Sequence, residues 1–418
     1  MSAFASRWLA LPDGVRELAP TALPAGFRAA GVAAGIKPEG LDVALLVTGG
    51  PAPSSAARFT PSAVVGAPVT VSRAARLDAL RAVVVSSGNA NVADGERGLE
   101  TARAAQAAAA RALGVEPAEV AVAATGVIGR ELPRERLLSG IDSAVGALGG
   151  DADTLSRAIL TTDQGPKRAC LEVALGAGMV RLAGQAKGAG MMAPAFSSAT
   201  LICLVETDAE VDPALLDALT GTAAGRSFDR ITVDGQLSTS DTLVCLASGA
   251  SGVRVEPGGE DEARLGAALE ALLLALALEI VRDGEGARRV GRVVVRGAPE
   301  WVEPVARAVA DSPLVKTALH GADPNFGRIL QAAGAALAML GAGGNGSVPL
   351  DLRIEGRTLV TAGAVAELGD GLLEELERAV SGPEVEYELG LPGAGGEAEL
   401  FFSDLGHGYV TLNAEYTT

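Results

Sequence analysis

The sequence predicts an α/β (α+β) fold in which mixed sheets are layered with helices. Long helical segments interleave with strands, and many strands follow one another without a crossover helix, which favours mixed sheets. Hydrophobic residues make up 48% of the 418 residues but aromatic residues only 3%, so Ala, Val, Leu and Ile must fill the core. A chain of this length forms two or three domains or one large unit.

The first part of the chain alternates strands with loops before its first long helix. Between residues 23 and 69, Gly and Pro turns separate short apolar runs, and residues 43–47 are an expected strand. Residues 80–86 form a second, strongly apolar strand. The polar loop SSGNANVADG follows it, and an Ala-rich helix is expected over about residues 98–113.

The next strand, residues 120–124, ends at the sequence ATGVIG. A strand, a glycine-containing turn and a helix in this order would present backbone N–H groups at the turn. Residues 156–162 are expected to be helical or extended, and residues 177–182 form another strand.

The most unusual segment is AKGAGMMAPAFSSATLICLVETDAEVD, residues 186–212. Its first half is too rich in Gly, Met, Pro and Ser for a regular helix or strand. Its second half opens with an apolar strand at residues 200–205. A hydroxyl residue, Thr200, therefore begins a buried strand directly after an irregular segment.

The second half of the chain predicts further alternation of helices and strands. The expected helices are residues 213–224, 262–281, 326–340 and 372–380. The expected strands are residues 243–247 and 292–296, a hairpin that turns at Glu355 and Gly356, and three alternating strands that end at EYTT.

Charge and composition exclude several classes of partner. The formal net charge of -17 argues against nucleic acid, since phosphate binding needs clustered Lys and Arg. Residues 271–278 are the most apolar run and are too short to cross a membrane. The N-terminus does not resemble an export signal. Three scattered cysteines, Cys170, Cys203 and Cys245, are typical of buried small residues in a reducing compartment, so we expect a cytoplasmic protein.

Histidine is too scarce to supply a metal site or an obvious catalytic triad. Only His320 and His407 occur, and neither accompanies a GxSxG sequence. If the chain performs acyl chemistry, its general base is therefore expected not to be histidine, and an N-terminal α-amine is a recognised substitute. The GxGxxG match at residues 341–346 is read as an ordinary turn, because a helix precedes it and a strand follows.

Nine separated motifs, in order, make the sequence resemble the ornithine acetyltransferase (glutamate N-acetyltransferase) family over nearly its whole length. They are GNAN at residues 88–91, TGVIG at 125–129, TTD at 161–163, KGAGM at 187–191, AT with the following strand and TDA at 199–209, DGEGA at 283–287, LVKTA at 314–318, DPNFGRI at 323–329 and NAEYTT at 413–418.

The resemblance implies an N-terminal-nucleophile-like architecture that processes itself. Family members cut their precursor between an alanine and a threonine, here Ala199 and Thr200, which would give an α chain of residues 1–199 and a β chain of residues 200–418. Thr200 would then carry both the nucleophilic hydroxyl and a free α-amine of pKa about 7.7 to 8, suited to general-base catalysis. The oxyanion hole of the family maps to Thr125 and Gly126.

The resemblance also implies the substrates and their contacts. The acetyl group would pass from N-acetylornithine to glutamate through an acetyl-threonine ester. The substrate-binding positions carried over are Thr161, Lys187, Thr200, Glu285, Asn413 and Thr418. Thr162 remains an alternative to Thr161. No cofactor or metal is implied, and the sequence leaves open whether acetyl-coenzyme A also serves as a donor.

Two other functions remain open at this point. One is an N-terminal-nucleophile aminopeptidase or amidase that passes the acyl group to water, and the other is a non-catalytic binding protein on the same scaffold. Processed pairs are expected to form a dimer of pairs, a heterotetramer. Three segments depart from the family pattern: AFSS before Ala199, SSGNANVADG at residues 86–95 and DGQLSTSDT at residues 234–242.

Overall fold

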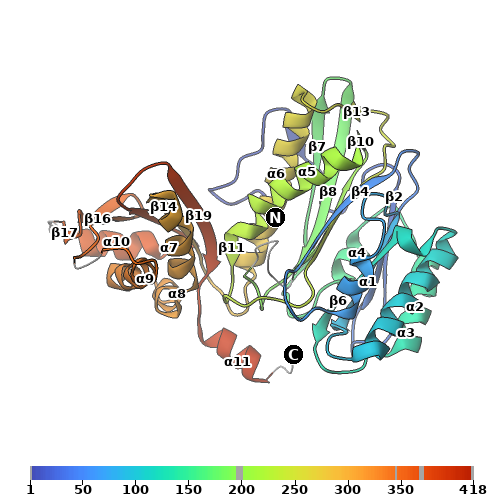
Figure 1. Cartoon of the computed structure of the whole chain (residues 1–418), viewed down its shortest axis with the longest axis horizontal. Helices are drawn as coiled ribbons and strands as arrows, with labels where there is room; N and C mark the ends of the chain where they lie inside the picture. Colours follow the sequence, from blue (N-terminus) through green and yellow to red (C-terminus); the bar gives the residue numbers. More distant parts are fainter. Residues whose placement is uncertain (1, 194–200, 344–345, 367–370, 416–418) are drawn as a thin grey trace. The chain divides into compact units, whose positions relative to one another are not determined.

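The computed structural model describes residues 2–193, 201–343, 346–366 and 371–415 (Figure 1). They divide into two compact units. Of the described residues, the first unit comprises those up to Asp229 together with Gln236–Ile280, and the second comprises Arg230–Gly235 and those from 281 to 415.

Two mixed sheets build the first unit. A six-stranded sheet has the order β1-β7-β8-β9-β12-β4, in which only β9 and β12 are parallel, and a four-stranded sheet has the order β2-β3-β5-β6, in which only β5 and β6 are parallel. β10 and β13 form a short parallel pair. The bounds of these strands are β1 Val15–Glu17, β2 Phe27–Val32, β3 Val43–Thr48, β4 Ser54–Phe59, β5 Ala82–Asn89, β6 Val120–Val127, β7 Lys167–Leu175, β8 Gly178–Lys187, β9 Ile202–Thr207, β10 Glu210–Val211, β12 Thr242–Ala247 and β13 Arg254–Val255.

Helices cover the outer faces of these two sheets, and α4 packs into the core between them. The helices of this unit are α1 Ala67–Arg73, α2 Gly95–Leu113, α3 Arg134–Gly146, α4 Asp153–Ala158, α5 Pro213–Gly225 and α6 Glu260–Arg282. Alternate side chains of the four-stranded sheet, such as Val84, pack with α2 and α3, which lie side by side in Figure 1. The intervening ones, such as Val83, pack with Leu204 of the six-stranded sheet. Leu276 of α6 lies against Gly184, on the far side of that sheet.

The second unit is one seven-stranded sheet with helices on one side. Its order is β11-β19-β14-β18-β15-β16-β17. The strands are β11 Ile231–Thr232, β14 Val290–Gly297, β15 Asp351–Ile354, β16 Arg357–Thr361, β17 Ala364–Val365, β18 Glu384–Gly390 and β19 Gly396–Ser403. The helices are α7 Pro299–Asp311, α8 Pro313–His320, α9 Phe326–Met339, α10 Leu372–Val380 and α11 His407–Glu415.

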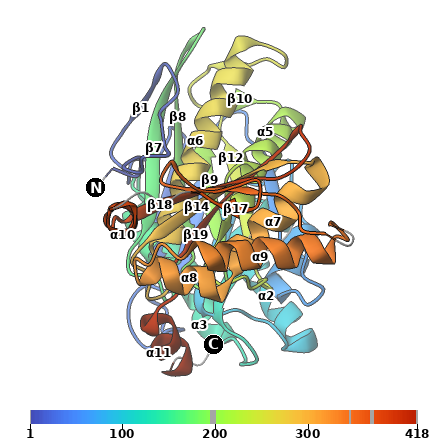
Figure 2. The same cartoon turned by 90° about the vertical axis from the view of Figure 1, so that its left-hand side faces the viewer.

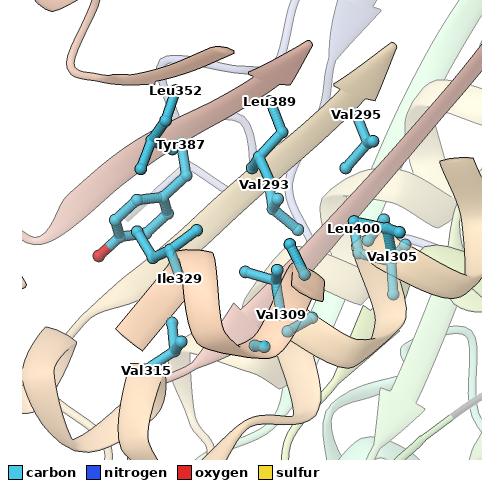
Figure 3. Close-up of a cluster of buried hydrophobic side chains, with 14 of the residues drawn as sticks. Val293, Val295, Val305, Val309, Val315, Ile329, Leu352, Tyr387, Leu389 and Leu400 are labelled. Carbon is cyan, nitrogen blue, oxygen red and sulfur yellow. The ribbon is translucent and has the colours of Figure 1, made fainter. Parts of the chain in front are cut away.

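The core of this unit lies between its sheet and helices α7, α8 and α9 (Figure 2). Val293 and Leu400 from the sheet meet Val305 and Val309 from α7, and Ile329 of α9 packs beside them (Figure 3). Leucine and β-branched side chains supply most of this contact, as the low aromatic content predicts.

The predicted mixed sheets layered with helices are confirmed, and most predicted elements lie within a few residues of the observed ones. The predicted hairpin turns at Glu355 and Gly356, between β15 and β16. Cys170, Cys203 and Cys245 are buried and free. Among the described helices, none combines the length and apolar character needed to cross a bilayer.

Two predictions about local structure are wrong. The last predicted strand is instead the helix α11, His407–Glu415. Since β19 already pairs with β11 on one edge and β14 on the other, it offers no free edge for another strand. The expected loop SSGNANVADG is also shorter than predicted, because β5 continues through Asn89 alongside β6.

Candidate active site

The sequence suggested that Thr125 and Gly126 follow the end of a strand. In the structure both residues lie within strand β6. β6 runs on to Val127, and the two residues pair with Ser87 and Gly88 of the parallel strand β5. Thr125 is only 1% exposed. The two candidate oxyanion donors therefore lie next to each other on β6, Thr125 buried and Gly126 half-buried.

Glycine is required where these two strands meet. Gly126 has φ 125° and Gly88 has φ 100°, conformations that residues with a side chain rarely adopt. A Cβ on Gly126 would lie 2.4 Å from the carbonyl carbon of Gly88 and 2.7 Å from the nitrogen of Asn89. The pairing is irregular here, with Asn89 opposite both Thr125 and Val127, and such a bulge locally changes the direction of the strand.

Lys187 brings a positive charge to Thr125. It is the last residue of β8 and is buried, and its Nζ donates a hydrogen bond to Thr125 Oγ1 at 3.2 Å. The structure thus joins two predicted site residues from different sheets. Lys187 also pairs with Ile202 of β9, which follows Thr200 by two residues in the sequence. Thr200 and Ala199 themselves lie outside the described residues.

Asp163 organises the surroundings of Lys187, a role that the sequence analysis missed although it noted the TTD motif. Its Oδ1 accepts hydrogen bonds from Lys167 Nζ at 2.6 Å and from the Gly188 N–H at 2.7 Å. Its Oδ2 accepts the Thr161 N–H at 3.1 Å and lies 4.0 Å from Lys187 Nζ. Asp163 therefore ties the predicted substrate residue Thr161 to the end of β8.

The carboxyl of Asp163 stays ionised despite its burial. Its side chain is 0% exposed, and burial alone would raise its pKa. Lys187, Lys167 and the hydrogen bonds from Lys167 and Gly188 outweigh that effect and hold its pKa well below the ordinary value. Asp163 and Lys167 form a buried ion pair in which the positive charge of Lys167 balances the negative charge of Asp163.

The first described residue after Thr200 is held on both sides of its backbone. The Leu201 N–H donates to the buried carboxylate of Asp241, and the Leu201 carbonyl accepts the Thr242 N–H at 2.8 Å. Asp241 comes from the DGQLSTSDT segment, which the sequence analysis noted only for its departures from the family pattern. No sequence signal shows this role, because the contact joins residues 40 positions apart.

Glu285 and Asn413 meet in the second unit. Asn413 Nδ2 donates to Glu285 Oε2 at 2.6 Å and to the Tyr409 carbonyl at 3.0 Å. Glu285 is 8% exposed. Next to it, Gly286 has φ 72°, and a Cβ there would lie 2.5 Å from the nitrogen of Tyr409, so glycine lets α11 approach this loop.

The predicted site residues thus form two groups, each within one unit. Thr125, Gly126, Thr161 and Lys187 belong to the first unit, and Glu285 and Asn413 to the second. Thr418 lies outside the described residues, as do both residues of the predicted cleavage site.

The two histidines lie in the second unit. His320 ends α8 with its Nδ1 3.1 Å from Asp404 Oδ2, and His407 begins α11. Within the described ranges, no three His, Cys, Asp or Glu residues are arranged to hold a metal ion.

Comparison with known proteins gives a consistent result over nearly the whole length of the chain. The sequence model of the ArgJ family matches residues 28–418. The arginine biosynthesis bifunctional protein ArgJ of Nitratidesulfovibrio vulgaris is 42% identical over 404 residues, covering 95% of this chain and 99% of that protein. The protein of the same description from Mycolicibacterium paratuberculosis is 40% identical over 419 residues, covering 97% and 98%.

A solved structure is also similar in sequence. It is ornithine acetyltransferase of Mycobacterium tuberculosis complexed with ornithine, 40% identical, with a TM-score of 0.41. The match covers 43% of this chain and 98% of that one.

Proposed function

The chain belongs to the ArgJ family, and from this premise we propose that it transfers an acetyl group from N-acetylornithine to glutamate in arginine biosynthesis. Family membership supports acetyl transfer, because the family match extends over residues 28–418. The site in the first unit supports the chemistry, since the buried ammonium group of Lys187, at the end of β8, meets a strand, β6, that carries the Thr125 hydroxyl and the Gly126 backbone N–H.

The hydrogen bond from Lys187 to Thr125 is the observation that carries the proposal. An ammonium group is only a donor, so Thr125 Oγ1 accepts from Lys187 Nζ. The hydroxyl hydrogen of Thr125 is then directed elsewhere, and the neighbouring positive charge makes it a stronger donor. A donor fixed in this way can stabilise a developing oxyanion without reorganisation during the reaction.

The nucleophile in this proposal is Thr200, freed by cleavage after Ala199. Its α-amine takes the proton of its hydroxyl as Oγ1 attacks the acetyl carbonyl of N-acetylornithine. Thr125 Oγ1–H and the Gly126 N–H stabilise the oxyanion. The C–N bond breaks, the α-amine returns its proton to the departing amine of ornithine, and an acetyl ester remains on Thr200.

Glutamate completes the cycle by the reverse route. Its α-amine attacks the ester carbonyl, the Thr200 amine accepts the proton, and the C–O bond breaks as the Thr200 hydroxyl is restored. Such a relay through a covalent intermediate predicts ping-pong kinetics.

Glu285 and Asn413 suit the part of the substrate that differs between ornithine and glutamate. The Glu285 carboxylate can accept hydrogen bonds from the ornithine side-chain ammonium. The Asn413 amide donates its two N–H groups to Glu285 and to the Tyr409 carbonyl, and the side-chain carboxylate of glutamate would take over one of these donors when it binds. The substrate-binding positions that the family resemblance implies, Thr161, Lys187, Glu285, Asn413 and Thr418, stay part of this proposal.

A direct assay tests the function against the hydrolase alternative. The purified protein is incubated with N-acetylornithine, with and without glutamate, and both amino acids and both acetylated products are measured. Acetyl transfer predicts that N-acetylglutamate forms and that, without glutamate, ornithine release stops at about one equivalent per active site, the amount set by the acetyl ester. Release of ornithine and acetate without glutamate would support the aminopeptidase or amidase function instead.

The remaining expectations belong to the same proposal. The enzyme would work in the cytoplasm without a cofactor, as a dimer of processed pairs. Replacing N-acetylornithine by acetyl-coenzyme A in the same assay tests whether it also uses that donor.

A further inference from the structure

Lysine is rare in this chain, and most of its lysines gather in one place. Of the 34 lysines and arginines only four are lysine: Lys37, Lys167, Lys187 and Lys316. None of the four is exposed, so the exposed cations of the chain are arginines. The first three surround Asp163 in the first unit.

The loop that carries Lys37 is fixed by a buried carboxylate. Asp42, which is 0% exposed, accepts the N–H groups of Ala34 and Ile36 at 2.6 Å and that of Lys37 at 3.0 Å. Both oxygens of Asp42 are therefore used by the backbone. The loop presents the Lys37 side chain in a defined direction.

That direction leads to the candidate active site. The Cγ atom of Lys37 lies over Gly88, so closely that a Cβ on Gly88 would be 2.5 Å away. Gly88 is the partner of Gly126 in the neighbouring strand. The Nζ of Lys37 donates to the Leu160 carbonyl at 3.0 Å, one residue before Thr161.

In the part of the chain that the structure describes, the three ammonium groups outnumber the carboxylates around them, which are Asp163 and, beside Lys37, Asp42. The closest ion pair of Asp163 is with Lys167 at 2.6 Å. Among the described residues, Lys37 forms no ion pair within 4.0 Å. Burial lowers the pKa of Lys37, and Lys187 lowers it further, while Asp42 and Asp163 oppose these effects. Lys187 is buried and Lys37 is half-buried, and two such ammonium groups near each other are stabilised by an anion that contacts both.

We propose that Lys37 is a further substrate-binding residue, which together with Lys187 receives the α-carboxylate that N-acetylornithine and glutamate share. This assignment rests on the proposed acetyl transfer. A ping-pong enzyme must bind the two amino acids in turn at one site, and the α-carboxylate is the charged group that is identical in both. Lys37 and Lys187 bind this constant group, so the residues that face the variable side chain need not hold it.

The test compares donors with and without the α-carboxylate. Kinetics are measured for wild type and Lys37→Met with N-acetylornithine and with N-acetylputrescine, which is the same donor without its carboxylate. Lys37→Met should raise KM for N-acetylornithine about tenfold to a hundredfold, as expected for loss of a charged hydrogen bond, with a smaller change in kcat. It should leave kcat/KM for N-acetylputrescine within about twofold, because that donor lacks the group that Lys37 binds.

Control variants separate a local from a general effect. Arg28→Met removes one positive charge from an exposed position on β2 of the same unit and should leave both donors unchanged. Lys37→Arg keeps the charge and should lose less affinity than Lys37→Met. A denaturing gel checks that every variant is processed like the wild type.

Thermal shifts test the same contact without turnover. Glutamate should raise the melting temperature of the wild type more than that of Lys37→Met or, if the latter does not fold, of Lys37→Gln. An unchanged KM of Lys37→Met for N-acetylornithine would overturn the assignment of Lys37. An equal loss of kcat/KM for N-acetylornithine and N-acetylputrescine would overturn it too. Absence of acetyl transfer by the wild type would overturn the proposed function, and this assignment with it.

Discussion

Lys187 Nζ donates a hydrogen bond to Thr125 Oγ1 at 3.2 Å, although the two residues are 62 positions apart and belong to different sheets. Both side chains are buried. This contact orients a hydroxyl on the strand that carries Gly126, and it makes Thr125 the residue whose removal should affect the transition state most specifically.

Thr125→Val should lower kcat by about a hundredfold to a thousandfold, the usual cost of one oxyanion donor. Valine keeps the shape of threonine and removes only the hydroxyl, so KM for N-acetylornithine should change little. Steady-state kinetics of acetyl transfer measure both. Thr70→Val, an exposed position on α1, is the matched control. A kcat of Thr125→Val within threefold of wild type would contradict the assigned role.

Lys187→Met and Thr125→Val should not be additive. Lys187 acts partly through the Thr125 hydroxyl, so removing the ammonium group costs less once that hydroxyl is gone. A double-mutant cycle on kcat/KM should give a coupling of about 0.5 to 3 kcal/mol, as residues in contact do. Strict additivity would mean that the hydrogen bond contributes nothing to the reaction.

Asp241→Asn should slow the cleavage between Ala199 and Thr200. The Asp241 carboxylate accepts the N–H of Leu201, directly after the predicted nucleophile, and hydrogen bonds to charged groups contribute about 1.5 to 3 kcal/mol. The loss corresponds to a cleavage rate about ten to a hundred times slower.

A time course on a denaturing gel after synthesis measures that rate. Asp13→Asn, an exposed position in the same unit, is the control and should be processed like wild type. Normal processing of Asp241→Asn would show that the carboxylate is dispensable for cleavage.

Glu206 should make the protein less stable as the pH rises. Burial in the middle of β9 raises the pKa of Glu206 to about 8, against a smaller opposing effect of the Gln185 hydrogen bond. Between its ordinary pKa of 4.5 and about 8, the folded state binds more protons than the unfolded state. The free energy of unfolding therefore falls over this range and levels off above it.

Glu206→Gln should remove this dependence, because a neutral side chain of the same shape has no proton to lose. Urea denaturation from pH 5 to 9 measures the free energy of unfolding of both proteins. The value for Glu206→Gln relative to that of wild type should rise with pH, by a few kcal/mol at pH 9. Parallel pH profiles of the two proteins would contradict the raised pKa.

The sequence predicted the elements well where local patterns decide them. The apolar runs at residues 80–86 and 243–247 are buried strands β5 and β12, and the Ala-rich segment is helix α2. The C-terminal alternation was misread, because whether a strand can form there depends on β19, whose two edges are already paired.

The site could be predicted only in part. Motifs identified Thr125 and Lys187 as site residues, but their contact depends on how two sheets pack. The roles of Asp163, Asp241 and Lys37 come from contacts with backbone groups of distant segments, which leave no periodic or spacing signal in the sequence. The predicted nucleophile Thr200 stays a prediction, since it lies outside the described residues.

The N-termini of the active protein show whether the bond between Ala199 and Thr200 is cut. Active protein is purified, its chains are separated on a denaturing gel, and each is subjected to N-terminal sequencing. Self-cleavage predicts two chains, residues 1–199 and 200–418, the second beginning TLICL, and a single inactive chain for Thr200→Ala. Active protein that is intact across the Ala199–Thr200 bond, or full turnover by Thr200→Ala, would contradict it.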